Sequence, residues 1–300
     1  MAIQNSLQKS KGNQRLCITA YLTGDAVKNQ INQVVGGKNG QRFISAIVSA
    51  VNTNPTLQEC TNQSILSGAL LGESLKLSPS PQLGHYYLVP FNDKTKGKVA
   101  QFQMGYKGYI QLAIRSGQYK KINVIAVKEG ELEYFDPLNE EIKINMMIDK
   151  WDEREAAPTI GYYAMFELVN GFRKAIYWSK AQMEAHALKY SPGYKKDRRD
   201  GSNHTFWSKD FDGMAYKTML RQLISKWGIM SIDMQSAIDA DMAVINEDGS
   251  KDYVDNDDSI IDAEPQQSEE PQPEPRQEAE KKPETTQQPT DAQMALFGNK

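Results

Sequence analysis

The sequence predicts an α+β fold in which antiparallel β-hairpins pack against helices. Apolar residues recur at helical spacing after residue 40, the β-prone period dominates from residue 85, and helical spacing returns after residue 179. Asn170-Gly171 sits between two alternating runs and is the strongest short hairpin signal in the chain. Strands joined by such short turns pair antiparallel, which favours a sheet built of hairpins.

Two helices are expected first. One ends at Asn54-Pro55, and its apolar stripe consists of Phe43, Ile44, Ile47, Val48 and Val51. The other covers residues 61–77 and is ended by the Pro-rich stretch SPSP. Four small residues on it would allow a close contact with another helix: Ser67, Gly68, Ala69 and Gly72.

Strands are expected in the middle of the chain. Residues 85–92 and 98–107 flank the turn-like sequence DKTKGK and form a hairpin, and a helix over 108–117 follows, with Gly117 just past its end. Further β-prone runs come before the hairpin at Asn170-Gly171; they cover residues 120–130, 131–136 and 141–147.

The last part of the folded region is expected to be helical. Ser179 and Gln182 form a capping box at the start of one helix, residues 193–201 form a basic loop, and a long helix covers Phe206 to Trp227. A basic side of this long helix carries Lys209, Gly213, Lys217 and Arg221 at intervals of four. An apolar stripe lies about a quarter-turn away and consists of Tyr216, Leu220, Leu223 and Trp227.

Composition divides the chain into a polar arm over 1–40, a core domain over 41–240 and an acidic tail over 241–300. The tail holds 16 acidic and 5 basic residues, whereas residues 1–240 hold 22 acidic and 30 basic residues. A basic body favours a polyanionic partner, because neutralised phosphates release counterions. The arm is expected to be mobile or weakly helical and the Pro- and Glu-rich tail disordered, with the final apolar MALFGNK as a docking peptide or an untethered end.

Several classes of protein are disfavoured. The two cysteines, Cys17 and Cys60, lack metal-ligand spacing, and no secretory signal or long apolar run occurs, so a cytoplasmic protein without a metal is expected. GxxxxGK[ST] is absent from the sequence, which argues against an ATP motor. The histidines are isolated from any nucleophile motif. No cofactor is expected.

The stretch QFQMGYKGYIQLAIRSG, residues 101–117, mixes cations with tyrosines. Gly105 and Gly108 bracket Tyr106-Lys107 and would allow a close backbone approach. Arg115, Lys120 and Lys121 lie at the other end of the helix. Cations for phosphates and rings for unstacked bases suit single-stranded nucleic acid. The alternative is that Phe102, Tyr106 and Tyr109 are core aromatics, an interpretation that we favour for Phe102.

Two other functions remain open at this point. Asp136, Glu141 and Lys143 imitate the acid, then acid-x-lysine pattern that holds a metal in one class of nucleases, although the same residues also read as a turn between strands. A non-catalytic scaffold whose basic face meets an acidic protein is the third possibility.

Three separated blocks resemble the RecT family of phage and prophage single-strand annealing proteins: LGHYYLVPFN, VAQFQMGYKGYIQLAIRSG and FWSKDFDGMAYKTMLRQLISKWG. The likeness spans about residues 40–235. It implies ATP-independent binding and annealing of single-stranded DNA in homologous recombination, without a covalent catalytic step, by a homo-oligomeric ring or helical filament. It also implies a curved antiparallel sheet with helices lining a basic groove.

The resemblance also implies partners and site residues. The partners are the annealed duplex intermediate and a phage exonuclease, which supplies the single strands. The tail would reach a host single-strand-binding protein. The DNA-binding residues would fall in or beside the two later blocks: Tyr106, Lys107, Arg115, Lys120, Lys121, Lys209, Lys217 and Arg221.

Overall fold

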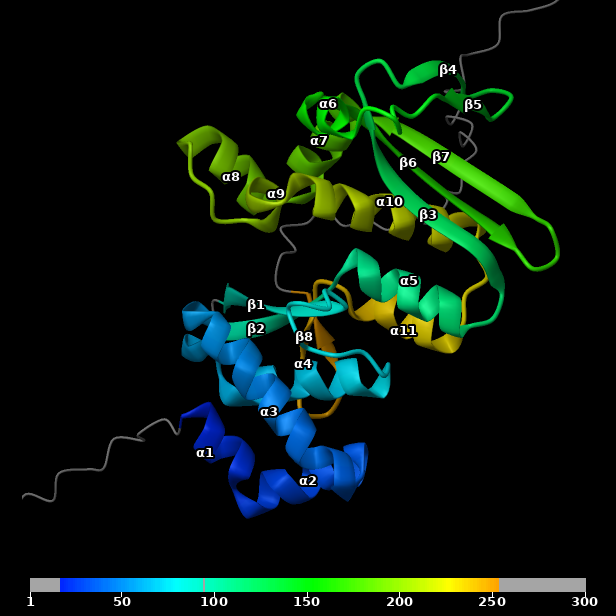
Figure 1. Cartoon of the computed structure of the whole chain (residues 1–300). Coiled ribbons are helices and arrows are strands. Elements are labelled where there is room, and N and C mark those ends of the chain that lie inside the picture. The colour runs from blue at the N-terminus through cyan, green and yellow to red at the C-terminus, as the bar shows by residue number, and fades with distance from the viewer. Residues whose placement is uncertain (1–16, 94, 254–300) are drawn as a thin grey trace, which may run out of the picture. The chain divides into compact units, whose positions relative to one another are not determined.

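The structure is a computed structural model and describes residues 17–93 and 95–253. It confirms the α+β class, because helices pack with strands that pair antiparallel throughout these residues (Figure 1). The largest sheet has the order β3-β6-β7. Its strands are β3 (Tyr119–Lys128), β6 (Thr159–Leu168) and β7 (Arg173–Ser179). Gly171, at a φ of 89°, lies in the predicted turn between β6 and β7.

The described part of the predicted N-terminal arm is helical. Three helices follow one another: α1 (Ile18–Thr23), α2 (Asp25–Val35) and α3 (Gly37–Thr53). Leu22 and Ile31 are fully buried in the main hydrophobic core, so tertiary contacts hold these helices. The polar composition of the segment does not predict such contacts. The boundary that we predicted at residue 40 therefore falls inside α3. Residues 1–16 of the arm lie outside the described residues.

The small residues of the second predicted helix face a strand. This helix is α4 (Asn62–Ser74), which follows the short 3-10 helix η1 (Pro55–Glu59), and it packs on the predicted hairpin of β1 (Tyr86–Asp93) and β2 (Gly97–Met104). A Cβ on Gly72 would lie 2.2 Å from the Tyr86 ring. The close contact that we expected between helices is therefore made with β1.

The predicted helix after β2 is α5 (Tyr106–Arg115), and Gly117 follows its end at a φ of 69°. The next β-prone runs include the hairpin of β4 (Leu132–Asp136) and β5 (Glu141–Ile144), and helix α6 (Trp151–Ala156) comes before β6. The capping box of Ser179 and Gln182 is confirmed at the start of α7 (Lys180–Tyr190).

Two predictions for the following segment are wrong. The basic stretch is a helix, α8 (Pro192–Asp200), and the long helix is divided into α9 (Phe206–Lys209) and α10 (Phe211–Trp227). The division occurs at Asp210, whose carboxylate caps α10 by accepting a hydrogen bond from the Gly213 N–H. Lys209 therefore lies on a different helix from Lys217 and Arg221.

The folded chain continues past residue 240, where we predicted the tail to begin. After α11 (Ile232–Ala240) come the short strands β8 (Val244–Ile245) and β9 (Lys251–Asp252). The N–H of Phe102 donates to the carbonyl oxygen of Ala243, and Val244 and Ile245 are buried. Residues 254–300, the rest of the predicted tail, lie outside the described residues. Within the described ranges, no helix combines the length and apolar character that crossing a membrane requires.

Candidate nucleic-acid interface

The glycines around Tyr106-Lys107 allow a close approach by the chain's own backbone. Gly105 donates its N–H to the carbonyl oxygen of His85. A Cβ on Gly105 would lie 2.1 Å from the carbonyl oxygen of Gly84, and a Cβ on Gly108 would lie 2.1 Å from that of His85. The approach predicted at these glycines is thus made by residues 84–85, and it fixes the start of α5 against β1.

Four aromatic side chains, which we call the aromatic cluster, meet where β1, α5, α9 and α10 converge: Tyr87, Tyr106, Phe206 and Tyr216. The rings of Tyr87 and Phe206 lie 5.6 Å apart, and those of Tyr106 and Tyr216 lie 5.5 Å apart, edge to face. Tyr87 also lies beside the residue that precedes Tyr106, since a Cβ on Gly105 would lie 3.2 Å from its ring. Burial, with the charges of Asp210 and Tyr106, raises the pKa of Tyr87. Phe206 is 38% exposed. An exposed aromatic ring such as this can stack on a base.

Exposed cations border the aromatic cluster. Lys107, in the first turn of α5, lies over the Tyr106 ring and beside Gly84. Lys209 ends α9, one turn after Phe206, and is also exposed. The first turn of α5 carries no acidic residue, and the unpaired N–H groups at a helix start favour anions. Of the predicted residues, Lys107 therefore lies beside Tyr106, and Lys209 lies one helical turn from Phe206.

Lys217 does not reach the surface, which corrects its predicted role as a phosphate contact. Its side chain is 8% exposed, and its ammonium group lies 2.8 Å from the carboxylate of Asp241. Asp241 also accepts hydrogen bonds from the Met104 N–H and the Tyr109 hydroxyl. The ion pair thus joins α10 to β2 and α5. The four-residue spacing that suggested an exposed basic side cannot reveal a carboxylate from a distant segment.

The other predicted cations are exposed or half-buried, and most are bound within the chain. Arg115 donates to the carbonyl oxygens of Leu75 and Lys76, just past the end of α4. Lys120 and Lys121 share one carboxylate, that of Glu167, so one positive charge is left uncompensated there. Arg221 is half-buried on α10, and its charge acts on both Tyr109 and His186.

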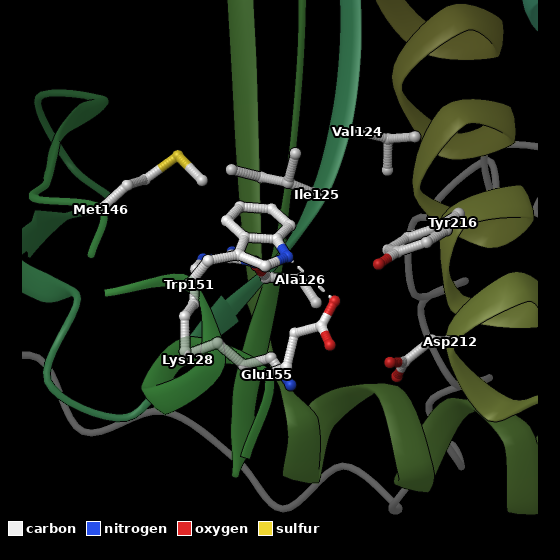
Figure 2. A pocket seen from close by; sticks show the side chains of 10 residues that line it. Val124, Ile125, Ala126, Lys128, Met146, Trp151, Glu155, Asp212 and Tyr216 are labelled. Carbon is white, nitrogen blue, oxygen red and sulfur yellow. Dashed lines mark hydrogen bonds between the residues drawn. The ribbon is translucent and has the colours of Figure 1, made fainter. Parts of the chain in front are cut away.

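A pocket of about 440 Å³ opens beside the same helix, α10 (Figure 2). Trp151 from α6 and Tyr216 line it, together with the carboxylates of Glu155 and Asp212. Its cations are already engaged: Arg154 pairs with the buried Glu131, and Lys128 donates to the carbonyl oxygen of Ala157. The negative charge that remains does not suit phosphate groups.

The residues of the nuclease hypothesis do not form a metal site. Asp136 and Glu141 are paired across the β4-β5 hairpin, but Asp136 accepts hydrogen bonds from the N–H groups of Leu138 and Asn139 and from the Asn139 side chain. Lys143 pairs with Glu133. In the described part of the chain, no three His, Cys, Asp or Glu residues are grouped so as to hold a metal ion. The turn between strands, the other interpretation, is what these residues form.

Two members of the aromatic cluster, Tyr87 and Phe206, were missed as site residues from the sequence. Both lie in the blocks that carry the family resemblance, which was the signal available. Their pairing joins β1 to α9 across more than 100 residues of chain, and periodicity within a segment does not report such contacts.

A model of the RecT family matches residues 41–260, which include every element of the aromatic cluster. The chain belongs to the RecT family. It is 40% identical over 279 residues to the uncharacterized protein YqaK of Bacillus subtilis (strain 168), covering 90% of this chain and 89% of the relative. It is 28% identical over 246 residues to Protein RecT of Escherichia coli (strain K12), covering 78% of this chain and 86% of that protein. RecT family membership points to single-stranded DNA annealing in recombination rather than to conventional enzyme catalysis.

Proposed function

We propose that the chain binds single-stranded DNA and anneals it to a complementary strand without ATP, as a ring or helical filament of identical subunits. The observation that carries the proposal is the RecT family match over residues 41–260. Its support in the structure is the aromatic cluster bordered by Lys107 and Lys209.

The chemistry requires no bond to be made or broken in the DNA backbone. Lys107 and Lys209 neutralise phosphates, while Phe206 and Tyr106 offer ring surfaces for bases. Such contacts leave the hydrogen-bonding edges of the bases available. Base pairing with a second strand then supplies the free energy of annealing, so no nucleotide hydrolysis is needed.

The other predicted cations take graded parts in this proposal. Arg221, half-buried on α10, adds positive charge, and Lys120 and Lys121 near the start of β3 add one charge that Glu167 does not compensate. Arg115 chiefly holds α5 against the end of α4. Lys217 contributes from the interior by fixing α10 to α5 through Asp241.

Partners of the annealing reaction remain part of the proposal. A phage exonuclease would supply the single strands, and a host single-strand-binding protein would be met through the acidic tail. Most of the tail lies outside the described residues, so this part rests on the sequence alone.

The site assignment is tested with the double substitution Lys107→Ala and Lys209→Ala in the full chain. Two lost phosphate contacts should weaken binding of an end-labelled oligonucleotide roughly ten-fold and reduce the slope of log affinity against log salt by about two. Fluorescence anisotropy over a salt series measures both quantities.

The matched control is Lys28→Ala with Lys38→Ala, which removes the same charge from exposed positions on α2 and α3. The control should bind like the parent chain. Equal weakening by both variants would mean that net charge alone governs binding, and no weakening by either would refute the site.

A further inference from the structure

Helix α8 displays four cations on a very short element. Lys195, Lys196, Arg198 and Arg199 are all exposed, whereas Tyr194 and Asp197 point into the protein and are buried. Arg198 pairs with Glu184 of α7, and Arg199 pairs with the adjacent Asp200. Among the residues that the structure describes, Lys195 and Lys196 form no ion pair. The surface, which we call the α8 basic face, therefore carries two positive charges that no carboxylate of the described residues compensates.

This arrangement opposes the intrinsic preference of the segment. Like charges three and four residues apart repel one another on a helix, and α8 contains such pairs in Lys195 with Arg198, Lys195 with Arg199, and Lys196 with Arg199. The helix nevertheless has well-formed ends. The Ser191 hydroxyl accepts a hydrogen bond from the Tyr194 N–H, and Gly201 ends the helix at a φ of 66°.

A buried carboxylate compensates for the repulsion. Asp197 accepts hydrogen bonds from the hydroxyls of Ser202, Thr205 and Ser208, and from the N–H groups of His204 and Thr205. Burial alone would raise the pKa of Asp197, but these hydrogen bonds hold it well below its usual value. The carboxylate therefore stays charged and ties α8 to the segment that leads into α9. The cations are held outward on a helix that is anchored to the rest of the fold.

Helix α9 connects the aromatic cluster, to which it contributes Phe206, with α8. Phe206 of α9 contacts Tyr87 of β1, whereas the next residue, Trp207, packs 6.1 Å from the Tyr194 ring of α8. Helices α8 and α9 are therefore neighbours, as Figure 1 also shows, so the two surfaces belong to elements that contact each other. They differ in chemistry, since the only aromatic side chain of α8, Tyr194, is buried.

We propose that the α8 basic face holds the phosphates of the incoming complementary strand, while the aromatic cluster holds the first strand. This inference rests on the proposed annealing function and assigns the second DNA strand to its own surface. A strand that is being paired must turn its bases toward the first strand, so it needs cations and no stacking rings. Phosphate contacts are independent of sequence and let a strand slide, which suits the search for the complementary register.

The test uses Lys195→Ala with Lys196→Ala in the full chain, and it separates the two strands in time. The protein is first bound to one labelled oligonucleotide, and its affinity is measured by anisotropy. The labelled complement is then added, and the pairing rate is followed by energy transfer. We expect unchanged affinity for the first strand, a roughly ten-fold slower pairing step, and a salt slope of that step reduced by about two.

Two further variants make the result decisive. Lys195→Arg with Lys196→Arg keeps the charge and should restore pairing, and Lys28→Ala with Lys38→Ala should pair at the parental rate. An unchanged pairing rate in the Lys195→Ala, Lys196→Ala variant would overturn the inference. So would an equal loss of first-strand affinity, because α8 would then belong to the first-strand site. If the parent chain binds no single strand, the proposed function itself fails.

Discussion

The ammonium group of Lys217 and the carboxylate of Asp241 form an ion pair that is almost completely removed from water. Asp241 is further bound by the Met104 N–H and the Tyr109 hydroxyl, so one side chain joins three elements. A buried charge that loses its partner is costly, because neither water nor another charge compensates it. The pair therefore holds α10, β2 and α5 together from the interior.

Replacing Lys217 should affect stability before it affects DNA binding. Lys217→Met keeps much of the side-chain volume but leaves the buried Asp241 carboxylate without its ion-pair partner. The free energy of unfolding should therefore fall by about 3–5 kcal/mol. Adding Asp241→Asn should recover part of the loss. Urea unfolding measures both variants. Unchanged stability together with weakened binding of single-stranded DNA would instead support the predicted role of Lys217 as a phosphate contact.

His186 provides a pH-dependent contribution to stability. Its ring lies 5.4 Å from that of Trp178 and 4.6 Å from that of Tyr190, and burial, with the charges of Arg221 and Lys189, lowers its pKa to about 4. The unfolded chain, with a pKa near 6.5, takes up the proton first as the pH falls. Stability contributed by neutral His186 is therefore present above about pH 6.5 and is lost toward pH 4.

The corresponding test compares the parent chain with His186→Gln, which cannot titrate. The parent should lose about 1 kcal/mol more unfolding free energy than the variant between about pH 7 and pH 5, a value reduced because part of the ring meets solvent. Urea unfolding at the two pH values gives the difference. The same loss in both proteins would show that His186 is not the titrating group.

At the scale of elements, the start of α5 depends on contact between two backbones. The missing side chains of Gly105 and Gly108 admit the carbonyl groups of residues 84–85, which places Tyr106 and Lys107 beside β1. Any Cβ at Gly108 must push α5 away from His85. The geometry of the aromatic cluster therefore depends on a residue that belongs to none of its rings.

Gly108→Ala should lower the free energy of unfolding by about 3 kcal/mol, because backbone atoms cannot yield as a flexible side chain can. It should also weaken binding of single-stranded DNA, since Tyr106 and Lys107 would shift with α5. The control is Gly37→Ala at the start of α3, where a Cβ meets no atom within 4 Å. That variant should be as stable as the parent. A Gly108→Ala protein of parental stability would contradict the packing described here.

Local signals predicted most elements, and long-range contacts account for the failures. The capping box at Ser179, the hairpin at Asn170-Gly171 and the helix before Gly117 were correct because each is encoded by neighbouring residues. Helix α8 was missed because a run of charged residues is typical of an exposed loop. What holds α8 in place is Asp197, which accepts hydrogen bonds from residues 202–208. For the site, the DNA-binding roles of Tyr106, Lys107 and Lys209 stay predictions, and the burial of Lys217 depends on Asp241, 24 residues away.

At the scale of the whole molecule, we expect the acidic tail to act on DNA binding through its charge. Residues 254–300 carry twelve acidic and four basic residues, whereas β9 at residues 251–252 still pairs with β8, and Asp252 pairs with Lys96. A truncation after Tyr253 therefore keeps the described fold, whereas a truncation near residue 245 would remove β9.

That truncation should leave the free energy of unfolding unchanged and should preserve or strengthen binding of single-stranded DNA, because the removed acids repel phosphates. Anisotropy at low and high salt, with urea unfolding as the control, checks both expectations. Weaker binding or slower annealing by the truncated chain would show that the tail assists the reaction.

Under the proposed function, this RecT family protein anneals DNA strands through contacts with phosphates and bases alone. The most direct measurement is the pairing rate of two complementary labelled oligonucleotides, with and without the full chain, in the absence of ATP. We expect that the protein accelerates pairing, that added ATP changes nothing, that raising the salt concentration suppresses the acceleration steeply, and that both strands stay intact. Pairing no faster than that of the DNA alone, or strands shortened when magnesium is added, would contradict it.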